Sequence, residues 1–170
     1  EPHGEIRRNS EGDLVGLKDG RILFMWSRMK GSTSDNAKSD ICRRYLSRDG
    51  RTWTDDEAVF PTPEGSLNVM SVSLLRLASG KLALLYLHKR SERDCRPVYY
   101  TSADEGATWS GPVTVIPDSR AGYYVVNNAR LVQLKGGRLV IPAAKDGICH
   151  WLSDDEGRTW REAKGGAVRA

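Results

Sequence analysis

The chain has 170 residues, of which 39% are hydrophobic and 28% charged, and its formal net charge is +4. No apolar run approaches the roughly 20 residues of a membrane-spanning helix, and the basic residues are spread among acids instead of forming the basic run of a nucleic-acid-binding surface. We therefore expect a globular domain with no membrane span and no nucleic-acid partner.

Three segments of the chain repeat one order of features. Each has an apolar run, a glycine turn, a second apolar run, a loop, a third run, a short acidic string and a fourth run. The segments cover residues 11–63, 64–118 and 119–170, and their turn glycines are Gly20, Gly80 and Gly137. The runs are short and rich in Val, Ile, Leu and Tyr, which favours strands joined in hairpins. Four antiparallel strands repeated about every 50 residues are typical of propeller blades.

The sequence therefore predicts an all-β partial β-propeller of about three four-stranded antiparallel blades over residues 1–170. Propeller rings close with about four to eight blades, so we expect half of a six-bladed ring. Missing blades of a longer polypeptide, or a second copy of the chain, would complete that ring. We expect a fragment.

The acidic string recurs as "SRDGRTW", "SADEGATW" and "SDDEGRTW", and we name each copy an acidic box. Its glycine tolerates the positive φ of a tight turn, its aspartate can accept backbone N–H groups as in an Asx turn, and its tryptophan can pack between neighbouring sheets. A catalytic site would not be built three times, and the ligand spacing of a calcium loop is missing, so we expect a structural role. The box residues are Ser47, Asp49, Trp53, Ser102, Asp104, Gly106, Trp109, Ser153, Asp155, Gly157 and Trp160.

Three cysteines, Cys42, Cys95 and Cys149, are too few and too widely spaced for a disulfide framework or a zinc site. Because their number is odd, at least one stays outside any intramolecular bridge. We expect buried free thiols, and neither a metal nor a cofactor.

The pattern Ser-x-Asp-x-Gly-x-Thr-Trp resembles the Asp box, or BNR repeat, of sialidases and related β-propellers. The second and third boxes match it fully, and the first is one residue shorter. The resemblance implies a fragment of a sialidase-like, exo-acting glycoside hydrolase that cleaves terminal sugars from a glycan. The alternative is a BNR propeller that binds glycans or proteins without catalysis, since fold does not fix function. By the same resemblance, a secreted or periplasmic location is compatible with the chain.

The repeat also indicates which face of the ring would carry a site. If the boxes join third and fourth strands, then the loops after each second strand and the entries to each first strand lie on the opposite face. In sialidases that opposite face carries the active site. The first segment has its longest loop there, "MKGSTSDNAKSD". Long loops on a rigid scaffold often carry binding and catalysis, and a solvated polar loop is the alternative.

The resemblance to sialidases implies a proton donor in the loop after the first blade's second strand, where Asp35 lies. A donor near neutral pH needs a raised pKa, and Glu11 or Asp13 could supply a neighbouring carboxylate. The candidate catalytic residues are therefore Asp35, Glu11 and Asp13. The family's tyrosine nucleophile and its glutamate partner come from later blades, and we expect Tyr123 and Tyr124 to pack.

Sialidases also grip the substrate carboxylate with three arginines. Arg28 matches the arginine that ends the second strand and Arg130 is a further candidate, although a surface ion pair would explain either. Where the family has a Phe-Arg-Ile-Pro motif, this chain has "SEGDLV". A carboxylate there favours a sugar other than sialic acid. Asp40 is the second choice for the proton donor. The other predicted substrate-binding residues are Asp40, Asn68, Lys89, Asn127 and Asn128. The amides of the three asparagines are suited to sugar hydroxyls and could equally cap turns.

Overall fold

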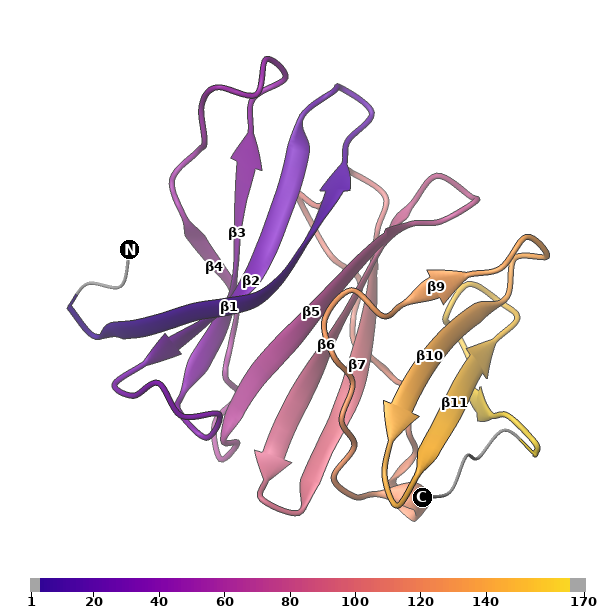
Figure 1. The fold of residues 1–170 in the computed structure, drawn as a ribbon. Coiled ribbons are helices and arrows are strands. Elements are labelled where there is room, and N and C mark those ends of the chain that lie inside the picture. Colours follow the sequence, from indigo (N-terminus) through magenta and orange to yellow (C-terminus); the bar gives the residue numbers. More distant parts are fainter. Residues whose placement is uncertain (1–3, 166–170) are drawn as a thin grey trace.

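The computed structural model describes residues 4–165 as three four-stranded antiparallel sheets that lie side by side in chain order (Figure 1). The first sheet contains β1 (Ile6–Gly16), β2 (Ile22–Lys30), β3 (Ser39–Leu46) and β4 (Glu57–Pro61). The second contains β5 (Asn68–Arg76), β6 (Leu82–Ser91), β7 (Asp94–Ser102) and β8 (Val113–Thr114). The third contains β9 (Val132–Gln133), β10 (Leu139–Ala144), β11 (Ile148–Ser153) and β12 (Arg161–Glu162). The prediction of an all-β partial propeller with three such blades is confirmed.

Helical structure is nearly absent from this part of the chain. Within residues 4–165 the only helical element is the 3-10 turn η1 (Asp118–Arg120), and none of the described residues forms a helix that could cross a membrane. The first strand begins at Ile6, ahead of the start at residue 11 expected for the first blade. This longer strand brings further side chains to the end of the sheet that carries the long loop.

Two clusters of buried side chains fill the seams between neighbouring sheets. Leu23 and Met25 of β2 belong to the first cluster, together with Leu84 of β6. The second cluster includes Leu85 of β6 and Ile141 of β10. Because successive strand residues point to opposite faces, β6 contributes to both seams. The middle sheet is therefore buried on both sides.

Each acidic box lies between the third and fourth strands of its sheet. In the second box, Ser102 Oγ donates to Asp104 Oδ1 (2.7 Å) and accepts the N–H of Gly106 (2.8 Å). Asp104 also accepts the hydroxyl (2.6 Å) and the N–H (2.9 Å) of Thr108. These bonds, that of the Thr108 hydroxyl above all, lower the pKa of Asp104 to about 2. The third box repeats the four bonds at Ser153, Asp155, Gly157 and Thr159.

The first box keeps part of this pattern. Ser47 Oγ donates to Asp49 Oδ1 (2.6 Å), which also accepts a backbone N–H. Trp53 of this box is 41% exposed, whereas Trp160 of the third box packs edge-on against Tyr99 of the second sheet, with 5.4 Å between ring centroids. Trp53 is more exposed because, within residues 4–165, no further sheet packs against the outer face of the first sheet.

Candidate functional site

The long loop and the entries to the inner strands lie at the opposite end of the sheets from the acidic boxes (Figure 1). We name this end the loop face. It comprises residues 31–38 between β2 and β3, the inner-strand segments 8–11 and 66–71, and the connection 121–131 that leads to β9. This arrangement follows from the antiparallel order, which alternates the connections between the two ends of each sheet.

Near the loop face, the inner strands and the connection to β9 contain non-glycine residues with a positive φ. Glu11 (φ 54°) and Ser71 (φ 60°) lie in irregular stretches of β1 and β5, and Ala129 (φ 55°) precedes β9. Such a φ costs a non-glycine residue about 1–2 kcal/mol and concentrates at functional sites and ligand clamps. Hydrogen bonds across the seams hold it in place, because the N–H of Ala129 donates to the carbonyl of Val72 (3.1 Å) and that of Ser71 donates to Glu11 Oε2 (3.1 Å).

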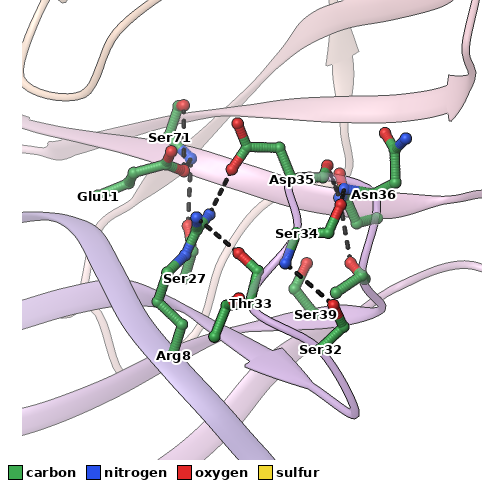
Figure 2. Close-up of polar contacts among 12 residues, drawn as sticks. Arg8, Glu11, Ser27, Ser32, Thr33, Ser34, Asp35, Asn36, Ser39 and Ser71 are labelled. Carbon is green, nitrogen blue, oxygen red and sulfur yellow. Dashed lines mark hydrogen bonds and ion pairs between the residues drawn. The ribbon is translucent and has the colours of Figure 1, made fainter.

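An arginine and two carboxylates gather where β1 meets the long loop (Figure 2). Arg8 donates to Asp35 Oδ1 (2.6 Å) and to the carbonyl of Thr33 (2.9 Å). Asp35 is the accessible member, since its side chain is 66% exposed. Glu11 lies beside them and accepts a second, longer bond from the hydroxyl of Ser71 (3.4 Å). Arg8 is not among the predicted site residues, because it precedes residue 11, where the first blade was expected to begin.

The environment of Glu11 differs from that of Asp35. Burial raises the pKa of Glu11, and the hydrogen bond from the Ser71 N–H and the charge of Arg8 oppose this shift in part. The negative charge of Asp35 adds to it. Glu11 also borders a pocket of about 500 Å³ on the outer face of the first sheet. That pocket is lined by Ile6, Asn9, Ser10, Glu11, Gly12, Phe24, Trp26, Arg28, Arg44 and Asp56.

Asp13 has the contacts of a seam residue. Its two carboxylate oxygens accept the N–H groups of Leu14 and Leu74, both at 2.8 Å. Ser73 makes the equivalent contact at the next seam, where its hydroxyl accepts the N–H of Arg130 (3.0 Å). Burial raises the pKa of Asp13. Its hydrogen bonds join neighbouring sheets, and a catalytic role for Asp13 remains a prediction.

Arg28 and Asp40 lie on the outer face of the first sheet, away from the Asp35 carboxylate. Arg28 forms an ion pair with Asp56 (2.5 Å) and lies over the ring of Trp26. Asp40 is buried and pairs with Lys30 (2.5 Å). The surface ion pair weighed for Arg28 is thus present.

Asn68 and Lys89 hold the long loop from beneath. Asn68 is fully buried, and its Nδ2 donates to the carbonyls of Asp35 (2.6 Å) and Ala37 (3.1 Å). Lys89 is 4% exposed and donates to Asn36 Oδ1 and to the Asp35 carbonyl (3.4 Å). Both residues therefore position the segment that carries Asp35.

The remaining predicted residues lie on the connection to β9. Asn128 Nδ2 donates to the carbonyl of Gly12 (3.1 Å), so its amide joins this connection to the inner strand of the first sheet. Asn127 and Arg130 are exposed on the surface. The structure thus brings Glu11, Asn68 and Lys89 to the Asp35 loop, whereas Arg28 lines the outer-face pocket that Glu11 borders.

Residues 4–165 contain neither a cluster of metal ligands nor an exposed thiol. No group of three or more His, Cys, Asp or Glu side chains among residues 4–165 is arranged to hold a metal ion. All three cysteines are free and buried, and burial raises the pKa of Cys95 to about 12. These thiols are expected to be unreactive.

Comparison with known proteins gives a family and a set of similar folds. The family model described as a BNR repeat-like domain matches residues 20–168. A protein of unknown function from Dyadobacter fermentans is 20% identical with a TM-score of 0.71, over 94% of this chain and 55% of that one. Trypanosoma rangeli sialidase is 21% identical with a TM-score of 0.72, over 94% and 31%. The NanB sialidase from Streptococcus pneumoniae is 13% identical with a TM-score of 0.72, over 97% and 45%. The chain therefore spans about half, or less, of the length of these similar proteins.

Proposed function

The chain belongs to the BNR repeat-like domain family, and from that premise we propose that it forms part of a sialidase-like glycoside hydrolase with its glycan site on the loop face. The observation that carries this proposal is the cluster of Glu11, Asp35 and Arg8. Two carboxyl groups held in different environments suit glycoside hydrolysis, in which one donates a proton and the other acts in its ionised form.

The two carboxyl groups can be given distinct roles. Glu11 is the half-buried group with the raised pKa, so it is suited to hold a proton and pass it to the glycosidic oxygen as the carbon–oxygen bond breaks. Asp35 is exposed and paired with Arg8, so it is suited to stabilise positive charge at the reacting sugar carbon. The resemblance to sialidases implies Asp35 as the proton donor, whereas the burial of Glu11 and the exposure of Asp35 support the reverse assignment.

The charged contacts bear on the identity of the sugar, and the exposed apolar side chains bear on how the ring is completed. Arg8 is already paired with Asp35, and Glu11 adds a carboxylate, so we propose a terminal sugar other than sialic acid. We also propose that further blades or a second copy complete the ring. Exposed apolar side chains on the outer sheets support this completion, among them Leu14 and Trp53 of the first sheet and Ile148 of the third.

The test uses the full-length protein and a panel of disaccharides with a terminal α-sialosyl, β-galactosyl, α-fucosyl or β-glucuronosyl group, whose sugar leaving groups need a proton from the enzyme. Glu11→Gln is expected to lower kcat/KM on the cleaved glycoside by roughly 10²–10⁴-fold while the circular dichroism spectrum stays unchanged. Asp35→Asn is expected to lower kcat as well. Glu64→Gln, at an exposed position, is the matched control and should leave turnover unchanged.

The outcomes separate the two candidate functions. Full turnover by Glu11→Gln would reject its role as the proton donor. Saturable glycan binding without cleavage of any glycoside would favour a BNR propeller that binds glycans without catalysis.

A further inference from the structure

Tyr123 is an aromatic side chain that meets solvent on the loop face. It lies in the connection 121–131 and is 37% exposed, whereas its neighbour Tyr124 is 2% exposed. The expectation that both pack is therefore wrong for Tyr123. Among the described residues the other large exposed aromatic is Trp53, which belongs to an acidic box at the opposite end of the sheets.

The backbone of Tyr123 is fixed on both sides. The N–H of Cys95 donates to the carbonyl of Gly122 (3.1 Å), and the N–H of Tyr124 donates to the carbonyl of Cys95 (2.8 Å). These two bonds attach the connection to the start of β7. A ring on such a support is oriented before any ligand arrives, which reduces the entropy lost on binding.

A buried ammonium fixes one side of the ring. Lys89 Nζ lies 5.1 Å from the centroid of Tyr123, within the range of a cation–π contact. The same ammonium donates to the Asp35 carbonyl and to Asn36 Oδ1. One lysine therefore connects the ring of Tyr123 to the loop segment that carries the Asp35 carboxylate.

The hydroxyl of Tyr123 is also free. Within residues 4–165 it makes no hydrogen bond, whereas four other tyrosine hydroxyls are paired. Those four belong to Tyr86, Tyr99, Tyr100 and Tyr124. The part of Tyr123 that faces solvent thus offers an aromatic surface and an unused polar group.

We propose that Tyr123 is a stacking platform for a pyranose ring of a glycan, in a subsite next to the sugar that reacts at Asp35. The face of an aromatic ring carries partial negative charge, and it attracts the C–H groups on the less polar side of a pyranose. The position of the reacting sugar rests on the proposed function, and the stacking contact does not.

The experiment measures binding of lactose, cellobiose and N,N′-diacetylchitobiose to the full-length protein by isothermal titration calorimetry. Tyr123→Ala is expected to raise the Kd of the saccharide that binds by roughly tenfold, the loss of one aromatic contact. Tyr123→Phe keeps the ring and should stay within about twofold of the wild type. Leu134→Ala, at a 51% exposed position after the end of β9 and away from this connection, is the matched control and should not change the Kd.

Three results would overturn the subsite. These are an unchanged Kd in Tyr123→Ala, an equal loss in Tyr123→Phe and Tyr123→Ala, or no binding of any of the three saccharides to the wild type. The hydrolysis assays are independent of this measurement. Binding that depends on Tyr123 in a protein that cleaves no glycoside would keep the subsite and reject the hydrolase.

Discussion

Alanine at Gly157 tests how closely the third acidic box packs against the second sheet. Gly157 has a φ of +87°, and a Cβ added there would lie 2.1 Å from Cε1 of Tyr99. Gly137, in the turn between β9 and β10, has a φ of +88° and no heavy atom within 4 Å of an added Cβ. Alanine at these two sites therefore separates the backbone cost of a positive φ from the cost of the contact.

The two costs can be estimated separately. A side chain in the left-handed region costs about 1–2 kcal/mol, and both variants carry this cost. Tyr99 is 1% exposed and its hydroxyl donates to the carbonyl of Glu156 (3.0 Å), so its ring cannot withdraw without breaking that bond. Forcing extra atoms into such a core costs about 1–3 kcal/mol. We expect a loss of about 1–2 kcal/mol in Gly137→Ala and about 2–5 kcal/mol in Gly157→Ala.

Urea unfolding followed by tryptophan fluorescence measures both losses in the same protein. Equal losses in the two variants would refute the close approach of the third box to Tyr99. The double variant Gly157→Ala/Tyr99→Leu should recover part of the extra loss, because the smaller side chain makes room for the new methyl group. Its recovery, compared with Tyr99→Leu alone, completes a double-mutant cycle for the contact.

Two further predictions concern the carboxyl groups of the inner strand. Asp13→Ala should lower the free energy of unfolding by about 1–3 kcal/mol, because the N–H of Leu74 loses its acceptor; urea unfolding at wild-type stability would contradict the seam role. Because burial raises the pKa of Glu11, the folded state holds the proton more tightly than the unfolded chain, whose Glu11 titrates near 4.5. Wild-type stability relative to Glu11→Gln should therefore fall as the pH rises from below 4.5 through the raised pKa. Urea midpoints of both proteins between about pH 4 and about pH 7 measure this difference, and a constant difference would exclude the shift.

The fold could be predicted because its signals are local and repeated. The turn glycines Gly20, Gly80 and Gly137 each donate their N–H to the carbonyl three residues earlier, at 2.8–3.0 Å. The boxes at Ser102 and Ser153 repeat one set of hydrogen bonds. Features of this kind need only a few neighbouring residues, so they can be recognised in a sequence without knowledge of the tertiary structure.

The site was predicted only in part, because its geometry depends on irregular backbone and on residues distant in the chain. Glu11 and Ser71 have positive φ values, yet neither is a residue type that signals such a conformation. Arg8 reaches Asp35 only because β1 begins at Ile6. Strand alternation could have shown that Arg28 and Ser27 face opposite sides of the sheet.

The N–H of Ser71 has two hydrogen-bond acceptors, and this allows Glu11 both to join neighbouring sheets and to take part in the proposed reaction. That N–H donates to Glu11 Oε2 (3.1 Å) and also to Ser27 Oγ (3.1 Å) (Figure 2). If Glu11 turns toward a substrate, Ser27 still accepts the bond, so this buried donor keeps a partner. A buried N–H without an acceptor would cost about 1–3 kcal/mol and would oppose each catalytic cycle. The contact with Ser27 removes that cost, and it leaves the Glu11 side chain free to turn while the sheets stay joined.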